Sequence, residues 1–560
     1  MSGFLRPSVM RGTDWRALEL GVSRLLSHCG WKDIQTVGGS GDKGADILAV
    51  RHNAKTSCTE SYLVQVKAAS GGRYVGTAAI DQALQGQGHY GAKVAVVATN
   101  GEFTRSAYVR RDELLSEGFR IRLWNGAFLT GLLERWPKYA AGKRELREYQ
   151  RKTVDEILRR FNAGCKKCLV VIATGLGKTV IAAAATDGLY EKGLRRVLVL
   201  CHTIDLAHQL QEAFWDEISK DVPTRLFSGG EAPVPIEGIN FGLYQSLYGY
   251  LGGLEPDAFD LIVVDEAHHA LGNAFSTCIE HLNPRLLIGM TATPWRGDGG
   301  SLESVFGEAV TRLSLVDGMR MGYLARVDYR LMCDNINWDE VPRLAKARVS
   351  IRDLNRRLFV PQRDEAIIAA LLEVMREFED PRVAVFSPSA RHAAAFAKKL
   401  VSAGVPAANL SIDDKLKRRR LLLEFASGRL RAVTSVDVLN EGIDVPDVNV
   451  LVFMRATHSR RIFVQQLGRG LRLSDGKTRV VVLDFVTDVR RLSAVVAIDR
   501  EAKDKPPGEY VETVHLDEGV VAFSDQRAAQ FIDAWLGDVA GLEDEDDTAV
   551  LVFPSAGDEA

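Results

Sequence analysis

The chain has 560 residues, too many for one hydrophobic core, so we expect three or four domains. Its composition is 46% hydrophobic, its N-terminus lacks a secretory apolar core, and no apolar run approaches the ~18 residues that a bilayer requires. These features exclude a membrane-spanning protein and predict a cytoplasmic one without membrane contact, in which the seven scattered cysteines stay reduced.

The net charge of −2 conceals a segregation of charge along the chain. Seven acidic residues and no basic ones lie in 541–560, which leaves a charge of +5 for the rest. The segment 451–474 carries five arginines and no acid, and such local basic surface can bind phosphates. The acidic run 543–547 predicts a disordered, solvated tail, with a regulatory contact to basic surface as the alternative.

Residues 12 to about 135 predict a small α/β domain. The expected elements are helices at 15–29 and 80–87 and strands at 45–50, 62–68 and 94–99. Asp46 opens the first of these strands. Gln65 and Lys67 lie two residues apart on the next, so the period of two places both on one face of the sheet.

These three side chains are suited to metal-assisted hydrolysis. An acid beside a side-chain oxygen can hold a divalent cation, which lowers the pKa of a bound water. A neighbouring lysine can orient that water or stabilise the charged transition state. Taken alone the pattern is weak, because Asp46 also fits a turn cap and a Gln-x-Lys pair also occurs on solvated strands.

Several segments then match a known family in order along the chain. They are Glu19 on the first helix, Gly41-Asp-Lys-Gly-Ala-Asp46, Gln65-Val-Lys67 and Gly101-Glu-Phe-Thr-Arg-Ser-Ala107. Over about 120 residues this set resembles the Mrr-like restriction endonucleases of the PD-(D/E)xK fold. The resemblance implies that Asp46 and Gln65 are metal ligands, Lys67 the catalytic lysine and Glu19 an accessory acid. Gln65 stands where the broader fold has Asp or Glu, but the Mrr-like branch uses Gln. The alternative is a fold that has lost its chemistry.

The stretch 168–179 predicts a buried strand that opens into a phosphate-binding turn. Its nucleotide-binding set is Thr174, Gly175, Leu176, Gly177, Lys178 and Thr179. The glycines let backbone N–H groups surround a polyphosphate, the lysine adds a point charge, and the last threonine offers a hydroxyl to Mg²⁺. Ile172 replaces the first glycine of the GxxxxGK[ST] pattern, so the motif is incomplete by itself. A helix over 178–190 would direct its positive end at the same site.

A second motif completes the first. Residues 259–264 predict an apolar strand that ends in two acids, Asp265 and Glu266. Asp265 is placed to hold Mg²⁺ through water, and Glu266 to orient and deprotonate the water that attacks the γ-phosphate of ATP. The alternative, a solvated acidic loop, is disfavoured by the lysine loop upstream.

From residue 146 onward, strands and helices alternate as in doubly wound parallel sheets. The predicted domains are 1–138, 139–325, 326–495 and a C-terminal extension, 496–560. The third has no lysine loop, but its segment 465–472 predicts a helix with Arg469 and Arg472 on one face. Such arginines can neutralise the γ-phosphate from the opposite side. The alternative is a surface helix that binds only nucleic acid.

These motifs, in this order, resemble the superfamily-two helicases, and most closely the branch with UvrB and the motor subunits of type I and type III restriction enzymes. The resemblance implies roles for residues that no single motif explains. Gln150 is implied for adenine, 291–293 for coupling, Asp444 for the interlobe switch, and Gln465, Arg469 and Arg472 for sensing the nucleotide.

The predicted fold is therefore α/β, with two tandem RecA-like P-loop lobes after a small restriction-endonuclease-like domain. The predicted function is an ATP-driven, Mg²⁺-using DNA helicase or translocase joined to a metal-dependent endonuclease, in restriction of foreign DNA. The sequence leaves open RNA as a substrate and a methyltransferase or other defence-system subunit as a partner. Two alternatives remain: a DNA-repair helicase whose N-terminal domain only binds nucleic acid, and a nucleic-acid-sensing ATPase scaffold.

Overall fold

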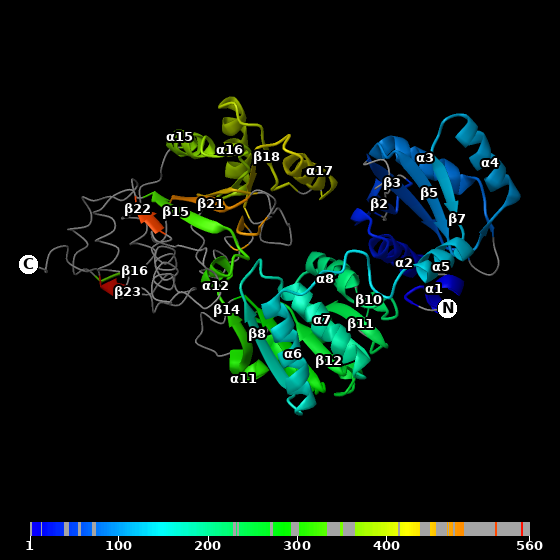
Figure 1. The fold of residues 1–560 in the computed structure, drawn as a ribbon, viewed down its shortest axis with the longest axis horizontal. Helices are drawn as coiled ribbons and strands as arrows, with labels where there is room; N and C mark the ends of the chain where they lie inside the picture. The colour runs from blue at the N-terminus through cyan, green and yellow to red at the C-terminus, as the bar shows by residue number, and fades with distance from the viewer. Residues whose placement is uncertain are drawn as a thin grey trace, which may run out of the picture. The chain divides into compact units, whose positions relative to one another are not determined.

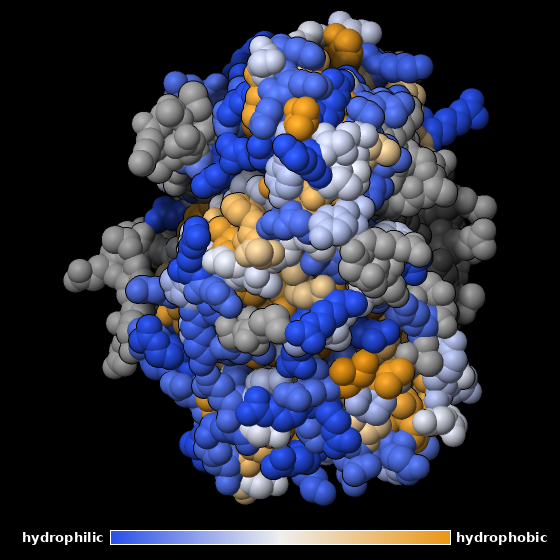
Figure 2. All heavy atoms as spheres, turned by 90° about the vertical axis from the view of Figure 1, so that its right-hand side faces the viewer, coloured by the Kyte–Doolittle hydropathy of each residue, from blue (hydrophilic) through white to orange (hydrophobic). Residues whose placement is uncertain are grey.

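A computed structural model of the chain divides into two compact units. The first contains residues 1–166, 179–265 and 272–288, and the second residues 167–178, 266–271 and 289–560. The structure describes residues 3–12, 14–37, 44–53, 58–69, 74–227, 231, 234–268, 273–292, 302–332, 348–350, 364–412, 415–436, 448–454, 468, 470–473, 477–485, 521–523 and 550–552. In this described part, no helix is long and apolar enough to cross a bilayer. Figure 2 shows a face on which hydrophilic residues predominate and apolar residues form small patches.

A five-stranded mixed sheet forms the N-terminal part of the first unit (Figure 1). Its strands in spatial order are β1 (Lys32–Thr36), β2 (Ile47–Asn53), β3 (Cys58–Lys67), β5 (Val94–Thr99) and β7 (Ile121–Trp124). Strands β1 to β3 are antiparallel, whereas β3, β5 and β7 are parallel. Open α/β sheets place ligands at the carboxyl ends of their parallel strands, and β3 ends in the predicted Lys67.

Apolar side chains cover both faces of this sheet because successive strand residues point to opposite sides. Val64 and Val66 pack with α2 (Trp15–His28) and α5 (Gly126–Arg135) on one face. Leu63 packs on the other face with α3 (Ala78–Tyr90) and α4 (Arg105–Ser116). Gln65 lies on the same face as Leu63 by this alternation, and a buried amide among apolar side chains needs a specific partner.

A seven-stranded sheet follows and contributes strands to both units. Its spatial order is β10 (Thr224–Leu226), β11 (Gly238–Leu243), β9 (Arg196–Cys201), β12 (Leu261–Val264), β13 (Leu286–Thr291), β8 (Lys167–Ile172) and β14 (Ala309–Leu313). The accompanying helices are α6 (Glu148–Asn162), α7 (Lys178–Glu191), α8 (Ile204–Glu217), α9 (Tyr244–Tyr250), α10 (Asn273–His281), α11 (Leu302–Phe306) and α12 (Leu315–Arg320). The pairs β10–β11, β11–β9, β12–β9 and β14–β8 are all parallel. Strand β12 is buried throughout, as expected of a strand covered on both faces.

The second unit contains another seven-stranded sheet (Figure 1). Its spatial order is β18 (Ala407–Asn409), β19 (Ala432–Ser435), β17 (Val383–Phe386), β20 (Val450–Phe453), β21 (Arg479–Phe485), β15 (Arg326–Met332) and β22 (Val521–Phe523). All of its pairs are parallel. Helices α15 (Asp364–Met375), α16 (Ala390–Ser402) and α17 (Lys415–Ala426) connect its strands. The predicted α/β class, a small sheet before two parallel-sheet RecA-like lobes, is confirmed.

Short elements complete the described chain, and some lie where the sequence predicted none. They are α1 (Pro7–Arg11), β4 (Tyr74–Val75), β6 (Glu102–Phe103), a 3₁₀ turn (Leu251–Gly253), β16 (Arg348–Ser350) and β23 (Val550–Val552). Strand β16 pairs antiparallel with β23. Two strands, β22 and β23, come from the predicted C-terminal extension. Pairing between residues this far apart leaves no local signal in the sequence.

The expected helix over 465–472 requires a correction at its end. Gly468 and Gly470 are helical, but Arg472 forms an antiparallel β-bridge with Leu324 instead of continuing the helix. Leu471 accepts a main-chain hydrogen bond from Ala325 N at 2.8 Å, so pairing with the chain before β15 competes with helix propagation. Arg472 is therefore placed by extended backbone and not by a helical face shared with Arg469.

Candidate functional sites

The phosphate loop between β8 and α7 depends on glycine at two positions. Gly175 has φ of 90° and Gly177 has φ of 82°, a left-handed conformation that strains any side chain. Ala173 N donates to Leu313 O at 2.8 Å, which ties the start of the loop to β14. The sequence identified both glycines from their spacing, and the backbone gives the physical reason for them.

Lys178, the first residue of α7, pairs with the acid Glu266 within the second unit. Its Nζ lies 3.5 Å from Glu266 Oε1, and the lysine side chain is 10% exposed. The other carboxylate oxygen lies 3.3 Å from Nδ1 of the buried His268, which also lies 3.1 Å from Thr291 Oγ1. The motifs predicted at 178, 265–268 and 291 are thereby joined in one polar chain.

Glu266 is held in an unusual backbone conformation. Its φ is +48°, and it is the one non-glycine residue with positive φ in the described part of the chain. This left-handed conformation costs about 1 to 2 kcal/mol for an L-residue, so the surrounding contacts must hold it in place. Backbone strain of this kind concentrates at functional sites, and no pattern in the sequence marks it.

Gly468 and Arg472 lie against the phosphate loop within the second unit. A Cβ added to Gly175 would lie 2.8 Å from Gly468 O and 3.4 Å from Arg472 Cγ. A Cβ on Gly468 would lie 2.9 Å from Thr174 O. Glycine at 175 and 468 therefore lets the two backbones approach closely, and this approach brings the Arg472 side chain to the loop that is predicted to hold phosphates.

Two polar atoms of the phosphate loop suit an anionic ligand. Thr174 Oγ1 and Lys178 Nζ are both buried and make no hydrogen bond among the described residues, although Lys178 Nζ forms the 3.5 Å ion pair with Glu266. A buried polar group without a hydrogen bond costs about 1 to 3 kcal/mol. A polyphosphate would satisfy both groups with charge-assisted hydrogen bonds, so the residues present fit a nucleotide.

The other predicted ATPase residues are divided between the two units or lie outside the described residues. Leu176 is buried, and Thr179 and Asp265 are partly buried. Gln150 is 5% exposed, and its side-chain oxygen accepts from Arg147 N at 3.0 Å at the start of α6. The predicted residues Asp444, Gln465 and Arg469 lie outside the described part of the chain, as does Thr293.

The nuclease-like site lies at the β2–β3 pair in the first unit. Asp46 immediately precedes β2 and is 6% exposed. One of its carboxylate oxygens, Oδ2, accepts hydrogen bonds from Gln65 Nε2 and from Val66 N, both at 2.5 Å. The structure thus brings Asp46 and Gln65 into direct contact, as the resemblance required. Lys67 follows on the same strand and is partly buried, while Glu19 is 7% exposed on α2.

Gln65 presents a suitable ligand atom for a cation. Its Nε2 is used by Asp46, whereas its Oε1 is buried without a hydrogen-bond partner in the part of the chain that the structure describes. Amide and carboxylate oxygens are the ligands that hard divalent cations prefer. The described residues contain no cluster of three His, Cys, Asp or Glu side chains suited to a metal, so a cation here would depend on this Asp–Gln pair.

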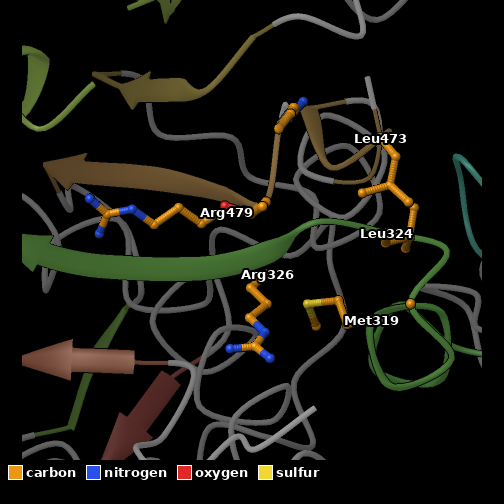
Figure 3. Close-up of a pocket in the computed structure, with 8 residues that line it drawn as sticks. Met319, Leu324, Arg326, Leu473 and Arg479 are labelled. Atoms are coloured by element: carbon orange, nitrogen blue, oxygen red, sulfur yellow. The ribbon is translucent and has the colours of Figure 1, made fainter. Parts of the chain in front are cut away.

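A cavity that the sequence did not indicate opens beside the Leu324–Arg472 bridge, with a volume of about 480 Å³ (Figure 3). Its lining residues are Met319, Gly322, Leu324, Arg326, Leu473, Lys477, Thr478 and Arg479. Figure 3 shows Leu324 and Leu473 at one end and Arg479 extending away from them. Arg479, one of the cationic residues that line the cavity, already has a partner, because its Nη2 lies 2.9 Å from Glu377 Oε2.

The fold and the loop geometry define a P-loop motor preceded by a restriction-endonuclease-like domain, and known families refine this class. Residues 10–133 match the Mrr catalytic family, described as restriction endonuclease. Residues 143–296 match the res subunit of type III restriction enzymes, and residues 366–474 match the helicase conserved C-terminal domain. The chain is thus a superfamily-two helicase with an N-terminal Mrr-type restriction endonuclease domain, which confirms the resemblance seen in the motifs.

Individual relatives match parts of this arrangement. The DNA 3'-5' translocase XPB2 of Sulfurisphaera tokodaii is 26% identical over 386 residues, covering 62% of this chain and 82% of the relative. The endonuclease subunit of the type I restriction enzyme EcoAI of Escherichia coli is 23% identical over 530 residues, covering 82% and 64%. The protein IRC3 of Saccharomyces cerevisiae is 24% identical over 355 residues, covering 61% and 51%. The chain thus spans between half and about four fifths of these relatives.

A solved structure shares the fold over most of the chain. It is that of the ATP-dependent type ISP restriction-modification enzyme LlaBIII bound to DNA, with a TM-score of 0.51 and 16% identity. The match covers 88% of this chain and 40% of that one. At this level of identity the likeness concerns the fold alone.

Proposed function

We propose that the protein is an ATP-driven DNA translocase or helicase whose N-terminal domain cleaves DNA, and that it serves restriction of foreign DNA. The observation that carries the proposal is the close approach of Gly468 and Arg472 to the phosphate loop at Gly175. An arginine at a phosphate loop is what a motor needs to sense and hydrolyse a bound nucleotide. DNA as the substrate is supported by the relatives named for DNA translocation and restriction.

In the motor, the Lys178–Glu266 ion pair is the resting state that a nucleotide would change. A polyphosphate carries more negative charge than one carboxylate, so Lys178 would move its contact from Glu266 to the phosphates. Glu266, still positioned by His268, would then orient the attacking water and accept its proton. Arg472 would neutralise the charge that develops on the γ-phosphate.

Thr179 and Asp265 would hold the Mg²⁺ that accompanies ATP. The ion neutralises phosphate charge when it is bound. Gln150 would bind adenine, and Asp444, Gln465 and Arg469 would complete the site as the family resemblance implies. Movement along DNA would follow from ATP binding that draws the two RecA-like lobes together and hydrolysis that releases them.

In the nuclease domain, Asp46 and Gln65 would hold a divalent cation. The cation lowers the pKa of a bound water when it is present. Gln65 Nε2 and Val66 N hold the Asp46 carboxylate in place with N–H donors that carry no charge. Lys67 would orient the attacking water or stabilise the charged phosphorus centre, and Glu19 would act as the accessory acid.

The working partners would be DNA and other subunits of a defence system, such as a methyltransferase. Joining a motor to a nuclease makes cleavage depend on engagement with DNA, which would spare host DNA that a methyltransferase has marked. The EcoAI relative is itself a subunit, which supports looking for this chain in a complex.

One gel experiment tests the proposal. Purified full-length protein is incubated with DNA and Mg²⁺, with and without ATP, alongside Lys67→Ala. We expect cutting by the wild type, and loss of cutting with intact ATP hydrolysis in Lys67→Ala. Cutting that survives Lys67→Ala removes the nuclease assignment. DNA-stimulated ATP hydrolysis with strand displacement but no cutting indicates a repair helicase, and ATP hydrolysis indifferent to nucleic acid indicates a scaffold.

A further inference from the structure

Within the first unit, a buried arginine of the nuclease domain donates hydrogen bonds to main-chain carbonyls of the motor. Arg24 lies on α2 and is 2% exposed. Its Nη1 donates to Val222 O at 2.7 Å and its Nη2 to Ser219 O at 3.1 Å. The Phe4 ring lies 4.3 Å from the guanidinium carbon, so the remaining surface of the cation meets an aromatic face.

In the opposite direction, a buried lysine of the motor donates hydrogen bonds to main-chain carbonyls of the nuclease domain. Lys220 follows α8 and is 9% exposed. Its Nζ donates to Leu133 O at 3.0 Å and to Trp136 O at 2.7 Å. These carbonyls lie at the C-terminal end of α5, where a helix has unpaired carbonyl groups and a partial negative charge. Each side thus caps main-chain carbonyls of the other with a cation.

These reciprocal hydrogen bonds of Arg24 and Lys220 restrict sliding between the two domains. Burial lowers the pKa of Arg24 to about 9 against the opposing pull of Asp187 and Asp221, so the charged guanidinium is costly at this position. The buried guanidinium therefore needs its carbonyl partners, and main-chain carbonyls cannot follow a shift as a flexible side chain can. The contact therefore favours one relative placement.

The segment that joins the domains, residues 136–144, is held on both sides. Pro137 O lies 3.0 Å from His28 Nε2 on α2, and Lys138 O accepts from Lys220 N at 2.8 Å. Tyr139 OH donates to Asp187 Oδ2 at 2.9 Å, and Asp187 lies on α7, the helix that begins at the phosphate loop. This joining segment is a structured part of the interface and not a flexible tether.

We propose that Arg24 and Lys220 are positioning residues that fix the nuclease domain to the first motor domain as one rigid piece. Glu19, the proposed accessory acid, lies on α2 with Arg24, so a movement of the first motor domain carries the nuclease site with it. Conformational change in the motor would reach DNA by moving the nuclease, without a hinge between them. The part of this inference that concerns DNA cleavage rests on the proposed function, whereas the rigidity does not.

Limited trypsin digestion of the full-length protein, without nucleotide or DNA, tests the rigidity. The joining segment offers trypsin three cleavage sites, Lys138, Lys143 and Arg144. Cleavage there requires local opening, so its rate reports how firmly the segment is held. We expect Lys220→Met to be cut on the order of 10-fold faster, because two charge-assisted hydrogen bonds are lost. Lys220→Arg, which keeps the charge and the donors, should be cut at nearly the wild-type rate.

Glu191→Gln is the matched control. Glu191 pairs with Lys138 at 2.6 Å across the same interface, but both side chains are half exposed. Exposed ion pairs contribute little, so we expect less than about a 2-fold change.

Unchanged cleavage of the joining segment in folded Lys220→Met and Arg24→Met overturns the proposal. If neither folds, Ser27→Ala decides, because it removes a 3.0 Å hydrogen bond to Asp216 at the same interface without burying a charge. It should accelerate cleavage about 2-fold, and no acceleration overturns the proposal.

The functional part has its own measurement, the number of DNA cuts per ATP hydrolysed. Lys220→Met should keep ATP hydrolysis while the cuts per ATP fall on the order of 10-fold, because the nuclease no longer follows the motor. Faster trypsin cleavage with unchanged cuts per ATP overturns the functional part and leaves the rigid joint standing. Wild-type protein that never cuts DNA overturns the proposed function, and the trypsin result still decides on the joint.

Discussion

In the motor, the acid Glu266 is held by Lys178 at 3.5 Å and by the imidazole of His268 at 3.3 Å. In the nuclease domain, Asp46 is held instead by neutral N–H donors, Gln65 Nε2 and Val66 N, both at 2.5 Å. Both acids are mostly buried, Asp46 directly before β2 and Glu266 two residues after β12, and they differ in the charge of these contacting groups.

This difference indicates which class of ligand each site is suited to bind. A carboxylate paired with a lysine is released when a ligand with more negative charge draws the lysine away, so the motor site suits a polyanion. The N–H donors of Gln65 and Val66 position the Asp46 carboxylate without adding positive charge, which supports the divalent cation proposed for the nuclease site. The predictions below test these two assignments.

The largest effect is expected for Arg472→Ala. If Arg472 neutralises the γ-phosphate, kcat for ATP hydrolysis should fall on the order of 10³-fold with little loss of ATP binding. The measurements are steady-state hydrolysis and titration with a non-hydrolysable ATP analogue. Arg376→Ala, an exposed arginine just after α15, is the control and should change kcat by less than about 2-fold. Near-normal turnover in Arg472→Ala assigns this arginine to another task.

Glu266→Gln is expected to lower kcat on the order of 10²-fold, because an amide cannot accept the proton of the attacking water. The amide also cannot form an ion pair with Lys178, so affinity for the ATP analogue should be retained or increased. Hydrolysis and analogue binding are measured as for Arg472→Ala. A Glu266→Gln variant that binds the analogue far more weakly would contradict the release of Lys178 by phosphate.

Gln65→Ala tests the nuclease side of the comparison. Loss of its Oε1 should weaken Mn²⁺ binding about 10-fold, as measured by calorimetry on the full-length protein without nucleotide. Mn²⁺ serves as the probe, and the readout does not depend on cleavage. Gln85→Ala replaces an exposed glutamine on α3 and should leave the affinity unchanged. Equal Mn²⁺ affinity in Gln65→Ala and the wild type would place the cation elsewhere.

The smallest effect concerns a buried acid outside both sites. Burial raises the pKa of Glu217, which is 2% exposed, against the pull of Arg144. The folded state therefore holds a proton more readily than the unfolded state, and stability falls as pH rises through the window above 4.5. Glu217→Gln should raise the free energy of unfolding by about 1 kcal/mol at pH 8, because it removes a buried charge.

The pH dependence of this gain in stability distinguishes the removal of a buried charge from a general packing effect. The difference in Tm between Glu217→Gln and the wild type should shrink as pH is lowered to values below 4.5, where Glu217 becomes protonated in both states. A gain that is the same at every pH contradicts the pKa argument.

Much of the motor could be predicted because its requirements are local. The backbone requires glycine at positions 175 and 177, because both have positive φ, and phosphate binding requires a positive charge at Lys178. Each requirement fixes the residue type at its own position, which can be recognised in the sequence. The positive φ of Glu266 leaves none, since it results from contacts that the whole fold imposes. Arg472 was found by residue type, but its backbone was assigned to a helix because the competing pairing with Leu324 is nonlocal.

The joint between the nuclease domain and the motor could not be predicted at all. Arg24 and Lys220 both donate to main-chain carbonyls, and any residue type can supply a carbonyl. A single arginine within an amphipathic helix is more often solvated, and a lysine after a helix usually lies on the surface. Their burial becomes visible only when two domains are folded together.

The most direct test of the account follows ATP hydrolysis and DNA cutting in one time course for the wild type, Glu266→Gln and Lys67→Ala. Glu266→Gln should lose both activities together, because cutting depends on the motor, whereas Lys67→Ala should hydrolyse ATP at the wild-type rate and not cut. Cutting by Glu266→Gln at the wild-type rate would contradict the account, because the nuclease would then work without the motor.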